Sequence, residues 1–106
     1  KQIISIGNDW SLFAINYDPT EDIKRIECPV MAINGNKDVQ VISELNLNAV
    51  RKNLSPNSKN MIKEYPNLNH LFQKCTTGLP NEYSTIEETI SPEVLSDIAN
   101  WIKSLK

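Results

Sequence analysis

The chain has 106 residues, of which 40% are hydrophobic and 23% charged, and its net charge is −2. This length accommodates one domain with one modest core, and the composition is that of a globular protein rather than a disordered one. No stretch approaches the roughly 20 apolar residues that span a bilayer, and the basic residues are scattered, so neither a membrane span nor a nucleic-acid surface is expected. No signal peptide is visible at Lys1, and the sequence leaves cytoplasmic and exported locations open.

Two helices are expected near the start of the chain. Aromatic and apolar side chains recur at i, i+3, i+4 and i+7 over residues 10–17, which is typical of one face of a helix. Asp18 and Pro19 have the character of an N-cap and a first helical residue, and they predict a second, short helix that continues to Lys24.

The middle of the chain predicts a strand, a helix and a second strand. Residues 30–33 form an uninterrupted apolar run that ends at an Asn-Gly-Asn turn, as expected of a strand buried on both faces of a parallel sheet. An apolar helical stripe begins after Ser43, interpreted as its cap, and ends at residues 55–57. Residues 60–65 predict a strand nearer the edge of the sheet, because polar residues interrupt it. This order predicts a right-handed crossover between parallel strands.

The last part of the chain combines a long loop with a helix. Residues 66–90 lack a periodic pattern, and loops of this length in small domains are usually functional. Ser91, Pro92 and Glu93 predict the start of a helix with a broad apolar face that extends to Leu105. The fold class is therefore α/β, but two strands are too few for a stable parallel sheet, so the fold is expected to be incomplete by itself.

Cysteines and acidic clusters give no sign of a disulfide framework, a metal site or a cofactor site. Cys28 and Cys75 are interpreted as reduced, packed thiols. Cys75 follows His70 by five residues, but no nearby base or helix N-terminus favours a lowered thiol pKa. The acidic clusters are interpreted as solvated charges: Asp18, Glu21, Asp22, Glu87 and Glu88.

Two polar side chains follow the predicted strands at the edge where α/β sheets bind ligands. Asp38 follows the first strand and His70 follows the second. If the strands are parallel neighbours, the two groups come within hydrogen-bond reach, and an Asp bonded to a His fixes the tautomer of the imidazole and stabilises the imidazolium formed in catalysis. The alternative is that Asp38 belongs to an ordinary turn and that His70 is a surface or structural histidine. Spacing alone leaves both interpretations open.

No nucleophile motif accompanies this pair. With glycines only at Gly7, Gly35 and Gly78, a G-x-S-x-G sequence cannot be formed. Ser43 and Ser91 are better explained as helix caps.

Two motifs resemble a known family. Residues 28–41 read CPVMAINGNKDVQV, which resembles the strand and turn that hold the triad acid in α/β-hydrolases. Residues 68–73 read LNHLFQ, which looks like the C-terminal end of that family, most closely of its bacterial esterase and serine-aminopeptidase-like branch. Further similar residues lie at 10–19, 77–78, 82–83, 86–92 and 101–102.

The resemblance covers about residues 10–103 and implies that the chain, residues 1–106, is the C-terminal part of an α/β-hydrolase domain, because the family order is Ser, acid, His. It implies that Asp38 orients His70, which takes a proton from a serine in the absent N-terminal part as that serine attacks an ester or related acyl carbonyl. The partner is then a small-molecule ester, no cofactor is needed, and the isolated chain is expected to be inactive.

An interaction module is the alternative to a hydrolase fragment. In that interpretation the chain is a stand-alone remnant that forms a homodimer through an exposed strand edge. The sequence does not decide between esterase, peptidase and thioesterase activity, and it does not name the substrate.

Overall fold

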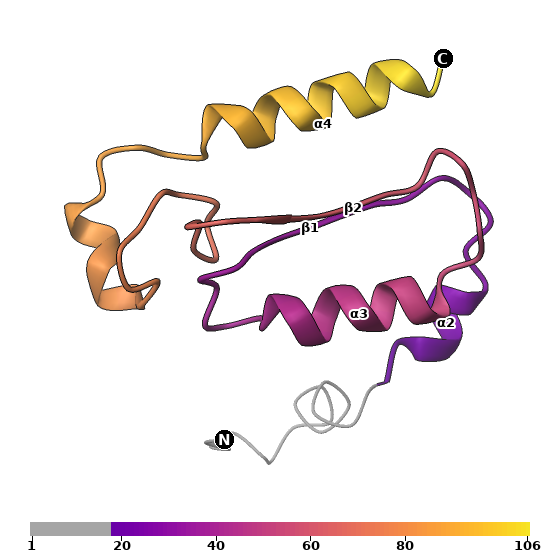
Figure 1. Cartoon of the computed structure of the whole chain (residues 1–106), viewed down its shortest axis with the longest axis horizontal. Helices are drawn as coiled ribbons and strands as arrows, with labels where there is room; N and C mark the ends of the chain where they lie inside the picture. Colours follow the sequence, from indigo (N-terminus) through magenta and orange to yellow (C-terminus); the bar gives the residue numbers. More distant parts are fainter. Residues whose placement is uncertain (1–17) are drawn as a thin grey trace, which may run out of the picture.

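The computed structural model describes residues 18–106, and the helix expected over residues 10–17 lies outside that range. No helix of the described residues is long and apolar enough to cross a membrane. In chain order the elements are α2 (Thr20–Lys24), β1 (Met31–Gly35), α3 (Ser43–Asn53), β2 (Met61–Tyr65), the 3₁₀ helix η1 (Pro80–Thr85) and α4 (Pro92–Ser104) (Figure 1). The described part is a mixed helix and strand structure, loosely α/β.

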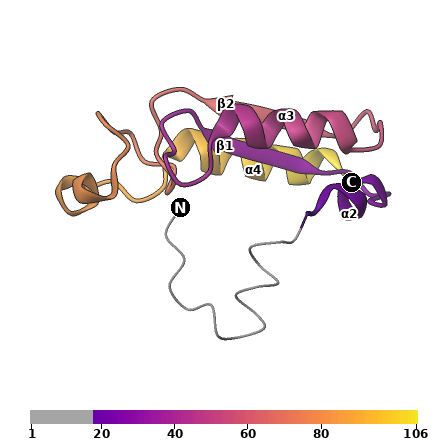
Figure 2. The ribbon, with the colours of Figure 1, turned by 90° about the horizontal axis from the view of Figure 1, so that it is seen from below.

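β1 and β2 form a two-stranded parallel sheet, in which Met31 pairs with Met61 and Gly35 with Tyr65. α3 connects the strands and packs on one side of the sheet, while α4 lies along the other side (Figures 1 and 2). The expectation that the first strand is buried on both faces is wrong for its first three residues, which are only half-buried. A single neighbouring strand and one helix on each side do not cover them fully.

The start of each helix lies close to its predicted position, but the capping contacts differ. α2 begins at Thr20, one residue later than expected, and the amide of Thr20 donates to the Asp18 carboxylate at 3.0 Å. Ser43 is not the cap of α3, since Ile42 occupies that position and the buried Ser43 hydroxyl donates to Glu64 on β2. Ser91 is the N-cap residue of α4, although its side chain makes no capping hydrogen bond.

A small core joins β2 to α4. It consists of Tyr65, Leu68 and Val94, with partly buried apolar side chains around it. The Tyr65 hydroxyl donates to Asp97 of α4 at 2.6 Å. Burial and the Asp97 carboxylate raise the pKa of Tyr65 far above its usual value, so this hydroxyl remains a donor. The core therefore fixes the strand from which the His70 loop departs.

Candidate functional site

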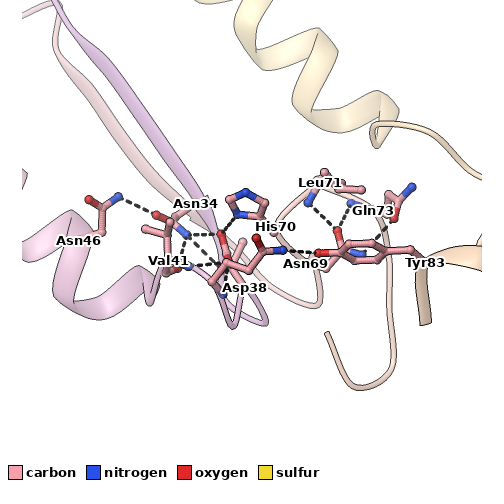
Figure 3. Close-up of polar contacts among 11 residues, drawn as sticks. Asn34, Asp38, Val41, Asn46, Asn69, His70, Leu71, Gln73 and Tyr83 are labelled. Carbon is pink, nitrogen blue, oxygen red and sulfur yellow. Dashed lines mark hydrogen bonds and ion pairs between the residues drawn. The ribbon is translucent and has the colours of Figure 1, made fainter. Parts of the chain in front are cut away.

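The carboxyl ends of β1 and β2 bring Asp38 and His70 together. Nδ1 of His70 lies 2.9 Å from Oδ2 of Asp38, although 32 residues separate them in the sequence (Figure 3). The expected hydrogen-bond reach is therefore confirmed. It follows from the parallel pairing, because both strands end at the same edge of the sheet.

Gly35 makes this close approach possible. A Cβ atom at Gly35 would lie 2.3 Å from the carbonyl oxygen of Leu68 and 2.8 Å from that of Asn69, both shorter than any tolerated contact. The amide of Lys37 also donates to the Leu68 carbonyl at 3.0 Å. The backbone that leads into His70 thus crosses directly over the end of β1, where no side chain would fit.

The side chain of Asn69 is buried within the His70 loop and hydrogen-bonds its backbone. It is fully buried, and its side-chain oxygen accepts hydrogen bonds from the amides of Leu71 and Gln73 at 2.9 and 3.0 Å. Its Nδ2 donates to Oε1 of Gln73 at 3.0 Å. Phe72 adopts a φ of 58°, in the left-handed region that bulky residues rarely occupy. Sequence reasoning missed Asn69 and Phe72, although Asn is a residue type that commonly bonds the backbone two residues further on.

Asp38 is buried and its carboxylate accepts four hydrogen bonds. Oδ1 accepts from the amides of Gln40 and Val41, both at 2.8 Å, and Oδ2 accepts from Asn34 at 3.3 Å and from His70. Burial raises the pKa of Asp38, but the hydrogen bonds from Val41, His70 and Gln40, with the charge of His70, outweigh burial and leave the pKa below its usual value. Asp38 is therefore an acceptor at neutral pH, so Nδ1 of His70 carries the shared proton and Nε2 remains free to accept another.

His70 faces a small open hollow. Its side chain is 36% exposed, and the hollow has a volume of about 210 Å³. The apolar part of its lining comes from Ile33, Val41 and Phe72. This volume is below the roughly 300–1,000 Å³ of typical small-molecule pockets. A larger hollow, of about 480 Å³, lies beside the connection between α3 and β2 and contains neither member of the pair.

The two cysteines take no part in this site. Cys28 is exposed, so its expected packing is wrong; it lies in the connection before β1 rather than inside an element. Sγ of the half-buried Cys75 lies 3.5 Å from the carbonyl of Asn67, and burial and the Glu82 carboxylate raise the pKa of this thiol. No group of three or more potential ligands that could hold a metal ion occurs among residues 18–106.

No protein-family model, curated protein or solved structure matches the chain. Its chemistry is therefore inferred from the geometry: a buried, ionised Asp38 orients a half-exposed His70. Such a pair can accept a proton at Nε2 and stabilise the imidazolium that results. A catalytic role for Asp38 and His70 stays a prediction.

Proposed function

We propose that the chain is the C-terminal part of an α/β-hydrolase domain and supplies the acid and the base of a Ser–His–Asp triad that cleaves carboxylic esters or related acyl bonds. The observation that carries this proposal is the 2.9 Å contact between Asp38 Oδ2 and His70 Nδ1, at the carboxyl edge of two parallel strands. The order of acid before histidine, and the resemblance of residues 28–41 and 68–73 to the family, support the same assignment.

The proposed reaction follows from the protonation state of the pair. A serine hydroxyl that approaches Nε2 of His70 transfers its proton to the imidazole while its oxygen attacks the acyl carbonyl. Asp38 stabilises the imidazolium, which then protonates the leaving alcohol as the acyl-enzyme forms. A water molecule then gives a proton to His70 while its oxygen attacks the acyl carbonyl. The bond between the acyl carbon and the serine oxygen breaks, His70 returns the proton to the serine oxygen, and the carboxylic acid leaves. Metal and cofactor have no part in these steps.

The nucleophile in this proposal comes from outside the 106 residues, which contain no G-x-S-x-G sequence. Within the described range, the hydrogen bond of the imidazole is to Asp38. The nucleophile and the backbone amides that would hold the oxyanion belong to the rest of the proposed domain.

The experiment uses the longest protein encoded in the reading frame of this chain. We expect an in-frame G-x-S-x-G sequence upstream, a serine that a fluorophosphonate probe labels, and hydrolysis of a p-nitrophenyl ester. The variants His70→Ala and Asp38→Asn should lower kcat by roughly 10³- to 10⁴-fold or more. Asn48→Ala, an exposed change on α3 outside the Asp38 network, should retain activity.

The isolated 106-residue chain serves as a second arm of this experiment. We expect it to show no His70-dependent burst with the same ester, because it lacks the nucleophile motif. A reading frame without the motif, or esterase activity that survives His70→Ala, contradicts the proposal.

A second candidate is a self-associating interaction module. It is favoured by the outer edge of β1, which pairs with no other strand in the part of the chain that the structure describes. An unpaired strand edge is a template for pairing with another chain. In this interpretation the Asp38–His70 contact serves only to fasten the two loops.

A further inference from the structure

A buried amide stands beside the Asp38–His70 pair. Asn34, the fourth residue of β1, is 4% exposed. Its Nδ2 donates to Oδ2 of Asp38 at 3.3 Å and to the carbonyl of Val41 at 3.1 Å (Figure 3). Its Oδ1 accepts from Nδ2 of Asn46, on α3, at 2.7 Å. Burying an amide costs free energy unless its hydrogen bonds are satisfied, and an apolar side chain would pack in the strand without that cost. The presence of a buried amide at this position therefore calls for an explanation beyond packing.

The contacts define which way the Asn34 amide faces. Asn46 donates to the oxygen, which leaves the NH₂ group directed at Asp38 and Val41. Both carboxylate oxygens of Asp38 are then hydrogen-bonded. The loop amides donate to Oδ1, while Asn34 and His70 both donate to Oδ2. A carboxylate held in this way cannot rotate away from the imidazole.

We propose that Asn34, oriented by Asn46, is a positioning residue that holds Asp38 Oδ2 against Nδ1 of His70. This inference rests on the proposed function, since it concerns the same pair. Its consequence is chemical: as long as Asp38 is held, neutral His70 keeps its proton on Nδ1 and presents Nε2 as the base. If Asp38 can rotate, the imidazole loses the partner that selects this tautomer.

The test is ¹⁵N NMR of His70 in the 106-residue chain, which reports which ring nitrogen carries the proton, together with titration of the Asp38 carboxyl by its ¹³C signal. Asn34→Leu removes the amide at similar volume. We expect the ratio of the Nδ1–H to the Nε2–H tautomer to fall by roughly threefold or more, because one hydrogen bond that fixes Asp38 is lost. The Asp38 midpoint should move to higher pH, because burial remains while a stabilising donor is gone.

Asn46→Asp provides a second variant, at an exposed position. A carboxylate at position 46 attracts the NH₂ group of Asn34 and turns its oxygen toward Asp38, so both signals should move in the same directions as in Asn34→Leu. The matched controls are Asn48→Leu and Asn48→Asp, exposed changes on the same helix, which should leave both signals unchanged.

A folded Asn34→Leu variant with the wild-type tautomer ratio and the wild-type Asp38 midpoint overturns the proposal. If far-UV circular dichroism shows that Asn34→Leu does not fold, Asn46→Asp decides, and spectra of His70 and Asp38 identical to those of Asn48→Asp overturn the proposal. The measurement needs no substrate. An inactive longer protein would therefore overturn the proposed function alone, and an unchanged tautomer would overturn the role of Asn34 alone.

Discussion

Gly35, Asn69 and Asp38 each contribute a different property to the site. Gly35 leaves room for the backbone that precedes His70, and Asn69 ties that backbone into a tight loop. Asp38 accepts a hydrogen bond from the imidazole Nδ1–H and is fixed by two loop amides. The position of His70 is thus set by backbone constraints on both sides of the contact rather than by the Asp38–His70 hydrogen bond alone, since a single contact to a half-exposed side chain is a weak constraint.

Glu82 fastens the loop that follows His70. Its carboxylate accepts hydrogen bonds from the amides of Thr76, Thr77 and Gly78 at 2.8, 3.1 and 3.0 Å. The bond from Thr76 is the strongest influence, and together these bonds outweigh partial burial and lower the pKa of Glu82 to about 2. Because this value lies below the ordinary 4.5, the carboxylate stabilises the fold fully above that pH and loses its contribution as the pH falls toward 2.

We therefore predict that Glu82→Gln lowers the free energy of unfolding at pH 7, and that the difference from the wild type shrinks as the pH falls from about 5 to about 2. Urea unfolding at a series of pH values measures both quantities. Glu87→Gln, an exposed change nearby, should show no such convergence. A deficit in Glu82→Gln that stays constant across this pH range would contradict the assignment.

At the scale of elements, α4 uses only part of its apolar face. Val94 is fully buried against Tyr65 and Leu68. Leu95 and Ile102, which the sequence places on the same broad face, are 51% and 49% exposed. The helical pattern correctly predicted the helix, but the two-stranded sheet is too narrow to cover its broad apolar face, of which only Val94 is fully buried.

Two neighbouring substitutions in α4 test this difference. Val94→Ala should lower the free energy of unfolding by about 2 kcal/mol, because it removes two buried methyl groups and leaves a cavity. Leu95→Ala should change the stability by no more than about 0.5 kcal/mol, since that side chain is half in solvent. Urea unfolding at neutral pH measures both. Equal losses for the two variants would show that α4 does not pack through Val94.

At the scale of the whole molecule, the main unsatisfied feature is the outer edge of β1, which no strand among residues 18–106 covers. On either side of β1, the carbonyl of Val30 accepts from the amide of Met61 at 2.9 Å and the amide of Asn36 donates to the carbonyl of Tyr65 at 2.8 Å. In the parallel register, the even-numbered residues between them therefore bond to β2. The odd-numbered residues direct their backbone groups to the opposite edge. β1 carries no charged side chain, whereas β2 contains a lysine and a glutamate. Charged side chains of this kind disfavour pairing of an exposed strand edge with another chain.

If the chain self-associates, we predict that it does so through β1. Sedimentation at increasing concentration should then show a dimer of the 12.0 kDa chain. Met31→Pro, which removes an outward amide without removing a bond to β2, should return the chain to a monomer. Ile62→Pro makes the matched change on the outer side of β2 and should leave the dimer intact. A dimer that persists in Met31→Pro, or that is lost in Ile62→Pro, contradicts this prediction.

The sequence by itself determined the order of α2, β1, α3, β2 and α4 and the placement of Asp38 and His70 after successive strands, but it did not predict η1, which lies in the stretch expected to be an irregular loop. These features depend on local signals, namely an apolar run, a helical stripe and a proline in the first turn, and such signals are present in the unfolded chain. The capping role of Ser43 was predicted wrongly because its hydroxyl finds a partner on β2, a contact that no local pattern encodes.

Only the tertiary structure decided the site itself. The 2.9 Å contact between Asp38 Oδ2 and His70 Nδ1 needs the parallel register of β1 and β2. The hydrogen bond from Asn34 to Asp38 depends on Asn46 of α3, which orients the Asn34 amide. The hydrogen-bonded pairs among these groups lie between 4 and 32 residues apart in the sequence. Hydrogen bonds depend on distances of a few tenths of an ångström, and those distances are set by packing of the whole sheet and its helices rather than by any one segment.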